Sequence, residues 1–210
     1  MVRTAKTAEA NMSIYHFDNA PNPWGDWGDI LVHGTIDWDE DTDVDSIARV
    51  GPFTPPAYIR SGVLVLTDPI KKKLADSELK GISRYEHLEK THIVKIDWSQ
   101  WNTDNDITYY LDLEDGPSSI IYSRAHDAEL ANEMPEFWQA FITGKINLYK
   151  NPKSNPSKLS KYLQVVQIDK KADFFKGDIY GGYFVNERAK AWLDQHCPKC
   201  FDFTLTPTIA

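Results

Sequence analysis

Carboxylates are the side chains of this sequence that most invite a chemical interpretation, and they are concentrated in its first quarter. No Lys or Arg occurs from Thr7 to Ala48, a stretch of 42 residues. Acidic side chains at this density can bind a cation, receive a basic partner, or form a solvated surface loop. The stretch holds ten carboxylates, namely Glu9, Asp18, Asp26, Asp29, Asp37, Asp39, Glu40, Asp41, Asp43 and Asp45.

A calcium-binding loop is the most specific chemistry that this acidic run could support. Asp37, Asp39 and Asp41 have the D-x-D-x-D spacing with which such a loop begins. The loop also needs Gly at its sixth position and Glu at its twelfth. Thr42 and Ala48 occupy those positions. The run therefore does not fit a calcium loop, and we predict no metal site here.

The two cysteines, Cys197 and Cys200, form a single C-x-x-C pair. One such pair cannot supply the four ligands of a structural zinc site, and no H-x₃-H pair is present to complete one. A thioredoxin-type motif would follow a strand and open a helix, whereas this pair follows a helical pattern and precedes a strand pattern. We expect two reduced thiols in a turn.

Nucleophilic and nucleotide-dependent catalysis find no support in the sequence. The G-x-S-x-G, P-loop and G-x-G-x-x-G motifs are all missing. Ser123, His126 and Asp127 lie close together in sequence, but the fold assembles a catalytic triad from distant segments. We therefore predict no catalytic residue and no cofactor, and we expect a protein that is not an enzyme.

The tryptophans near the acidic run allow three interpretations. Trp24, Trp27 and Trp38 could stack on sugar rings beside carboxylates that bind the hydroxyl groups. Trp24 and Trp27 could instead pin a loop rich in Pro and Gly to the core. All three could also anchor a protein interface, since Trp is enriched at binding hot spots.

Composition limits the classes of protein to consider. The chain has 210 residues, 41% of them apolar, and a formal charge of −8. That apolar fraction can build a core, and no apolar run approaches the roughly 20 residues of a membrane span. The acidic balance disfavours nucleic acid as a partner. Residues 1–11 lack the apolar region of a secretory signal, so we expect a cytoplasmic protein.

The periodicity of apolar residues predicts one α+β domain over residues 12–210, preceded by a flexible tail at residues 1–11. We expect a mostly antiparallel sheet and about three helices. The acidic run 37–45 has no periodic apolar face and should lie at the surface. Strands are expected at Ser13–Phe17, Ile30–Gly34, Val63–Leu66, Ile93–Trp98, Ile107–Leu113, Ile120–Tyr122, Leu163–Ile168, Tyr183–Val185 and Phe201–Leu205.

Helices are expected after Thr67, after Asn186, and over Asp127–Thr143, where Pro135 should kink or split the helix. Residues 145–161 contain five lysines and no acid, which predicts a basic loop.

Two of these segments share one pattern. Leu66–Leu74 and Val185–Leu193 align without gaps, and each combines the end of a strand, a capping residue, an acid and an apolar pair spaced i, i+4. Any capped helix after a strand can look alike, because the same physical requirements select the same residues. The pattern predicts a strand–helix–strand unit that the chain uses twice.

The second of these segments, Gly182–Leu193 followed by Phe201–Leu205, resembles a module of bacterial immunity proteins. In those proteins a strand, the residues Val-Ser-Glu-Arg, an amphipathic helix and a last strand end the chain. The segment from Leu64 to Ile82 resembles the N-terminal part of the same proteins. Asn186 stands where the module has Ser, and one C-x-x-C is present where one such family has two. The resemblance implies a protein encoded beside a polymorphic or contact-dependent toxin.

We therefore expect an immunity protein that binds a cognate toxin and blocks its active site. Charge suggests a basic nuclease or nucleic-acid-modifying toxin, because complementary potential speeds association and fixes register. The alternative is a carbohydrate-binding or glycan-processing protein that uses exposed Trp and Asp side chains. We expect no contact with nucleic acid or membrane. The predicted partner-binding residues are Asp37, Asp39, Glu40, Asp41, Asp43, Asp45, Trp24, Trp27 and Trp38.

Overall fold

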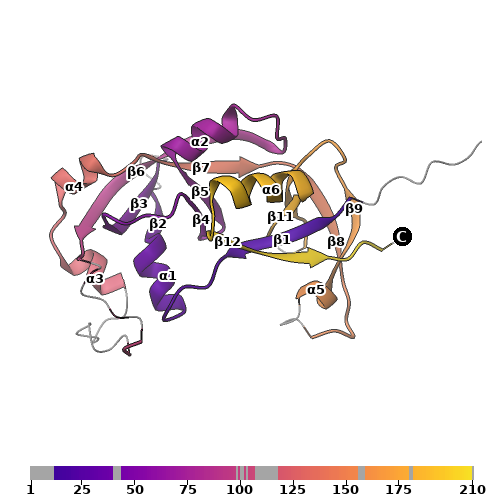
Figure 1. Cartoon of the computed structure of the whole chain (residues 1–210), viewed down its shortest axis with the longest axis horizontal. Coiled ribbons are helices and arrows are strands. Elements are labelled where there is room, and N and C mark those ends of the chain that lie inside the picture. The colour runs from indigo at the N-terminus through magenta and orange to yellow at the C-terminus, as the bar shows by residue number, and fades with distance from the viewer. Residues whose placement is uncertain are drawn as a thin grey trace, which may run out of the picture.

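The computed structural model describes residues 12–39, 44–97, 99, 102, 104–106, 118–155, 159–179 and 182–209. These residues form an α+β fold with two six-stranded sheets (Figure 1). Sheet one has the order β12 (Phe201–Thr206), β1 (Ile14–Asn19), β11 (Tyr183–Asn186), β10 (Phe174–Gly177), β8 (Lys145–Lys150), β9 (Leu163–Ile168). Sheet two has the order β2 (Thr35–Asp39), β3 (Val44–Gly51), β6 (Ile82–Lys95), β7 (Phe137–Ile142), β5 (Val63–Thr67), β4 (Ala57–Arg60).

The helices are short, and there are more of them than the sequence predicts. Between the named strands, the β3–β6 and β8–β10 pairings are parallel and the other described pairings are antiparallel. Six helices occur in the described part of the chain, namely α1 (Asp26–His33), α2 (Asp68–Ala75), α3 (Ser118–Ser123), α4 (Ala128–Glu133), α5 (Leu159–Tyr162) and α6 (Glu187–His196).

One supersecondary unit occurs in both sheets. In sheet two, β5 leads through α2 to β6, and β7 lies between these two strands. In sheet one, β11 leads through α6 to β12, and β1 lies between them. Each is a split β-α-β unit, in which two parallel strands enclose an antiparallel third. A further strand, β4 or β10, forms a hairpin with the first strand of each unit. The strand–helix–strand unit predicted twice from the sequence is thus confirmed.

Aligned lysines of the two units contact aromatic rings of the middle strand in the same way. Lys71 of α2 lies 4.1 Å from the ring centroid of Trp138, in the middle strand. Lys190 of α6 lies 5.7 Å from the ring of Tyr15, again in the middle strand. It also lies 4.9 Å from the ring of Phe203 in the last strand. These contacts are cation–π interactions, and in each unit they join the helix to the sheet.

The two helix N-termini differ in detail. The Asn186 side chain accepts a hydrogen bond from the Ala189 amide at 3.0 Å, which caps α6 as expected. Thr67 occupies the same position before α2, but its side chain caps nothing and its hydroxyl donates to the Pro56 carbonyl at 3.1 Å. The cap position was therefore predicted correctly, and the bond that Thr67 makes was not.

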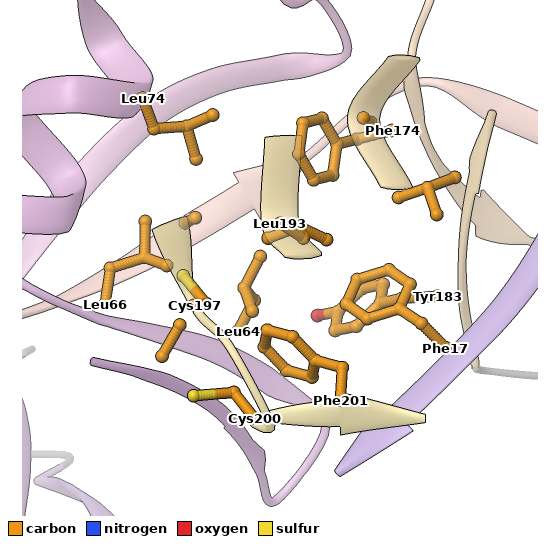
Figure 2. Packing of buried hydrophobic residues seen from close by; sticks show 14 of the residues in the cluster. Phe17, Leu64, Leu66, Leu74, Phe174, Tyr183, Leu193, Cys197, Cys200 and Phe201 are labelled. Carbon is orange, nitrogen blue, oxygen red and sulfur yellow. The ribbon is translucent and has the colours of Figure 1, made fainter. Parts of the chain in front are cut away.

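Both helices bury their apolar pairs in one shared core. Ile70 and Leu74 of α2 and Ala189 and Leu193 of α6 belong to the same cluster of buried side chains. Figure 2 shows Leu74 and Leu193 in this cluster together with aromatic residues of sheet one, among them Phe174. Because each helix covers part of the same core, neither unit encloses its apolar surface alone.

A buried carboxylate fastens the two units together. Asp173 is buried and accepts hydrogen bonds from the Lys80 amide at 2.8 Å and from the Asn186 side chain at 2.7 Å. Lys80 lies two residues before the start of β6 in sheet two, whereas Asn186 ends β11 of sheet one. Nearby, Gly81 and Gly144 lie against the Phe174 carbonyl so closely that a Cβ at either position would overlap its oxygen. The junction therefore requires both glycines.

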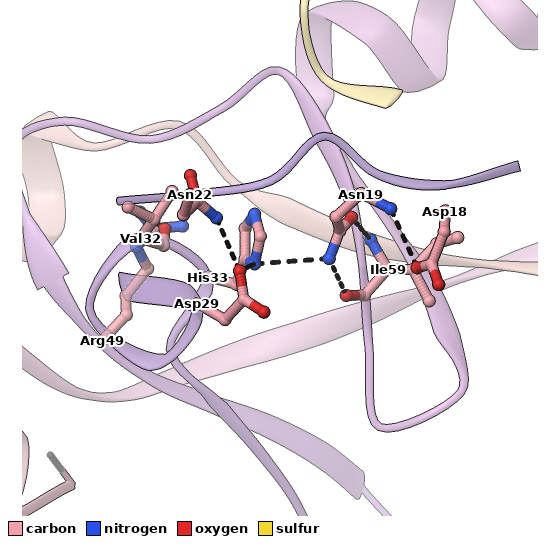
Figure 3. A network of polar contacts seen from close by, with 8 residues as sticks. All are labelled: Asp18, Asn19, Asn22, Asp29, Val32, His33, Arg49 and Ile59. Atoms are coloured by element: carbon pink, nitrogen blue, oxygen red, sulfur yellow. Dashed lines mark hydrogen bonds and ion pairs between the residues drawn. The ribbon is translucent and has the colours of Figure 1, made fainter. Parts of the chain in front are cut away.

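The edges of the sheets are closed in different ways. The Val165 amide of β9 donates to the Pro207 carbonyl at 2.8 Å, and the Ile209 amide donates to the Val165 carbonyl at 2.9 Å, so sheet one curls back on itself. In sheet two, the Asn19 side chain accepts from the Ile59 amide and donates to the Ile59 carbonyl, both at 2.7 Å (Figure 3). That pair covers the β4 edge. No described residue pairs with the outer edge of β2.

Several predicted elements are wrong. The Ile30–Gly34 strand is the second half of α1, where Gly28 allows the helix to approach the Pro23 carbonyl; a Cβ there would lie 1.9 Å from that oxygen. The Ile120–Tyr122 strand is α3, which buries Ile120 and Ile121. For the acidic run only a surface position was predicted, and its described ends lie in β2 and β3, where Asp37 and Trp38 are exposed.

The long helix predicted over Asp127–Thr143 is also wrong in its second half. Only α4 is helical, and after Pro135 the chain becomes β7. Pairing with β5 on one side and β6 on the other makes β7 a central strand, which favours its aromatic residues. The basic loop begins as strand β8, and the Ile107–Leu113 strand lies outside the described residues. The other predicted strands correspond to β1, β5, β6, β9, β11 and β12.

The shared core predicts that the two sheets unfold together. Leu74→Ala and Leu193→Ala should each lower the free energy of unfolding by about 3 kcal/mol, because each removes a buried side chain from one core. Denaturant titration followed by far-UV circular dichroism and by Trp fluorescence measures this. Coincident single transitions are expected in both variants, and the exposed Lys73→Ala control should change stability by less than about 0.5 kcal/mol. Two separate transitions would contradict a shared core.

Candidate partner-binding surface

The described ends of the acidic run lie in β2 and β3, an antiparallel hairpin at the edge of sheet two where no other described strand pairs with β2. Strands β2 and β3 are antiparallel, with Asp37 opposite Ser46 and Trp38 opposite Asp45. Directly opposed residues in such a pair lie on the same face of the sheet. Trp38 and Asp45 therefore share one face, and Asp37 lies on the other. The hairpin thus presents carboxylates on both of its faces.

The Asp37 carboxylate is held by a tyrosine from α3. The Tyr122 hydroxyl donates to Asp37 Oδ2 at 2.8 Å and lies 2.7 Å from the Thr35 hydroxyl. Burial raises the pKa of Tyr122 first, and its hydrogen bond to Asp37 raises it further. The phenol therefore stays protonated and donates to the carboxylate. This bond fixes the position of a negative charge beside the open edge.

The opposite face of the hairpin carries an exposed aromatic side chain beside a second anchored acid. Trp38 is 59% exposed. Asp45 accepts a hydrogen bond from the side-chain amide of Gln139, and that amide also lies 3.2 Å from Glu86 Oε2. Gln139 is buried in β7, and its side-chain amide contacts both carboxylates. An indole next to fixed carboxylates suits the contact of a basic partner.

The structure places the predicted site residues in three groups. Asp37, Trp38 and Asp45 are brought together in the hairpin, and Asp39 ends β2. Glu40, Asp41 and Asp43 lie outside the described residues. Trp24 and Trp27 flank the start of α1 and are half-buried.

The Trp24 side chain contributes to packing. Its indole N–H donates to the Asn105 carbonyl at 2.9 Å, which joins the segment before α1 to a distant loop. This contact supports the interpretation in which Trp24 pins its loop.

Sequence reasoning missed two residues of this surface, Tyr122 and Gln139. Tyr122 was assigned to a strand, and no local signal relates it to a carboxylate far away in sequence. Gln139 was assigned to a helix because the aromatic residues around it fit a helical period, and its contacts with Asp45 and Glu86 depend on strand pairing that no local pattern predicts.

A second polar cluster joins β1, α1 and β4 (Figure 3). His33 Nδ1 lies 3.3 Å from the Asn19 side-chain nitrogen and 3.9 Å from Asp29 Oδ1, and its ring stacks on Tyr58. Burial lowers the pKa of His33 to about 4, although Asp29 opposes that shift. The imidazole is therefore neutral, accepts from Asn19, and supports the residue that covers the β4 edge. This cluster is structural.

Arg49 is fully buried inside sheet two with no carboxylate bonded to it among the described residues. Its guanidinium has five N–H donors, and none is left for a ligand. Each donor has an acceptor, namely the carbonyls of Val50, Val32 and Phe53 and the hydroxyls of Thr54 and Tyr58.

Cys197 and Cys200 are free thiols after α6, as predicted, and both are buried in the shared core, which was not predicted. Burial raises the pKa of Cys197 to about 12 and also raises that of Cys200. Thiols that stay protonated are poor nucleophiles and poor metal ligands. In the described part of the chain, no three His, Cys, Asp or Glu side chains gather as a metal site would require. No helix there is long and apolar enough to cross a membrane.

Comparison with known proteins adds no relative. No family model matches the chain, and neither the curated proteins nor the solved structures include a significant match.

The neutral His33 predicts a specific loss of stability in mild acid. The folded-state pKa lies below the ordinary value of 6.5, so its stabilisation is complete above pH 6.5 and is lost as the pH falls towards 4. The loss should be about 2 to 3 kcal/mol. Urea unfolding at several pH values measures it, and His33→Gln should flatten the profile in this window relative to the His196→Gln control. An unchanged slope in His33→Gln would show that His33 carries no such linkage.

Proposed function

We propose that this chain is a non-catalytic binding protein, an immunity protein that neutralises a basic bacterial toxin by covering its active site. One observation carries the proposal. Among the described strands, β2 has an edge with no partner, and that edge carries Asp37 and the exposed Trp38. A free edge offers unpaired backbone groups that a strand of another protein can bind.

Charge indicates what kind of strand would bind there. Residues 35–48 belong to the stretch without Lys or Arg, and the one basic residue of β3, Arg49, is buried and bonded to carbonyl and hydroxyl groups. No basic side chain of the two strands therefore competes for Asp37 or Asp45. A partner segment rich in Lys or Arg gains complementary charge along the edge, and Trp38 offers a large apolar contact. Nucleases carry basic clefts for phosphate. Occupation of such a cleft by the hairpin excludes the substrate.

The acids of β2 also have a simpler role, because charged side chains on an edge strand discourage aggregation. Two features favour binding beyond that role. Asp37 is held by Tyr122 and Asp45 by Gln139, whereas protection against aggregation needs no fixed geometry. A large exposed indole such as Trp38 would oppose protection.

Co-expression tests the proposal. The protein encoded immediately upstream of this chain's gene should arrest growth alone, and this chain should restore growth and co-purify with it. Asp37→Lys and Trp38→Ala should each weaken the complex at least about tenfold, since one reverses a fixed charge and the other removes an anchor. Isothermal titration calorimetry at two salt concentrations measures the change.

The matched controls are Asp76→Lys, at an exposed acid after α2, and Tyr149→Ala, at an aromatic residue 46% exposed on β8. Both should bind like the unmodified chain. Failure of the upstream protein to arrest growth or to bind contradicts the immunity function. Tight binding that Asp37→Lys and Trp38→Ala leave unchanged contradicts only the assignment of the surface.

A further inference from the structure

A groove of about 450 Å³ lies beside the junction of the two units, and none of its lining residues belongs to β2. Its lining includes Ile142 at the end of β7 and residues of β8 and β10. Ligand sites in proteins have volumes of this order and often lie where two structural units meet. The lining residues are Ile142–Lys145, Asn147 and Lys176–Asp178.

Two lysines face this groove side by side. Strands β8 and β10 are parallel, with Lys145 directly paired to Lys176. Neither ammonium group forms an ion pair with an acid of the described chain. Like charges held opposite each other on neighbouring strands are destabilising unless something neutralises them. An anion bound between the two ammonium groups would relieve this repulsion.

The acid nearest these lysines in the groove does not neutralise them. Asp178 Oδ1 accepts hydrogen bonds from the Leu148 amide at 2.9 Å and from the Ile179 amide at 2.8 Å. This carboxylate thus closes the end of the β8–β10 pairing. The side chains of Asn147 and Thr143 add hydrogen-bonding groups to the same lining.

The walls of the groove are held rigidly. Gly144 lies against the Phe174 carbonyl, and its own amide points to the Gly81 carbonyl at 3.3 Å. The Lys176 amide donates to the Gly144 carbonyl at 2.8 Å. The backbone of the two lysines is therefore fixed before any ligand arrives, which reduces the entropy lost on binding.

We propose that this groove binds a small phosphorylated compound, with the phosphate between Lys145 and Lys176 and the organic part over Ile142. A phosphomonoester carries close to two negative charges at neutral pH, which matches two ammonium groups, and lysine binds phosphate as a point charge. The volume exceeds what inorganic phosphate alone would fill. This site is independent of the β2 edge and of the proposed immunity function.

Nuclear magnetic resonance titration of the whole protein tests the proposal at constant ionic strength. Ribose 5-phosphate and AMP are the probes, with ribose and adenosine as their uncharged counterparts. The phosphorylated probes should shift the backbone amides of Gly144, Lys145 and Gly177 in a saturable way, and the uncharged counterparts should not. The double variant Lys145→Gln/Lys176→Gln should weaken binding at least about tenfold, since two charge-assisted contacts are lost.

Lys95→Gln is the control, because Lys95 is an exposed lysine on β6 of sheet two. It should bind the probes as the unmodified protein does. Equal binding by the double variant would overturn the proposal, as would shifts confined to other residues or no shift at millimolar probe. Binding of a single-stranded oligonucleotide without binding of either small probe would also overturn it, in favour of a polyanion surface.

Discussion

The hydrogen-bonding edges of the two sheets are the constraint on which the arrangement of this protein depends. A sheet edge must be paired, covered or protected, because its backbone groups otherwise recruit other chains. Sheet one meets this requirement by curling until Val165 bonds to the segment after β12. In sheet two, the Asn19 side chain covers the outer edge of β4, and the His33 ring accepts a hydrogen bond from that side chain. The outer edge of β2 is the exception in the described chain, and it carries fixed acids.

Covering β4 also brings the two sheets together, since Asn19 belongs to β1 of sheet one. The same contact brings the two split β-α-β units side by side over one core. Leu74 and Leu193 then share apolar neighbours, and Asp173 joins the start of β6 to the cap of α6. The groove beside Lys145 and Lys176 is a product of that junction, whereas the hairpin edge lies outside it. The fold thus separates an acidic surface from a basic one.

Local rules predicted those parts of the fold that local contacts decide. The start of α6 at Asn186 follows from capping, and the apolar pairs of both helices follow from their spacing. The helix predicted over Phe137–Ile142 is wrong. The aromatic residues of this segment fit a helical period, but pairing between β5 and β6 makes it strand β7. The candidate site was predicted in part. Asp37, Trp38 and Asp45 came from composition, but Tyr122 and Gln139 come from segments that only the tertiary fold brings near.

The most direct test of the central claim is amide hydrogen exchange of Thr35–Asp39 in the free protein and in its complex with the toxin encoded upstream. Backbone groups at an open edge exchange with solvent, and pairing with a partner strand protects them. We predict slower exchange at alternate residues of β2 in the complex, with little change at β4, whose edge Asn19 already covers. Unchanged exchange along β2 in a saturated complex would contradict the claim that this edge binds the partner.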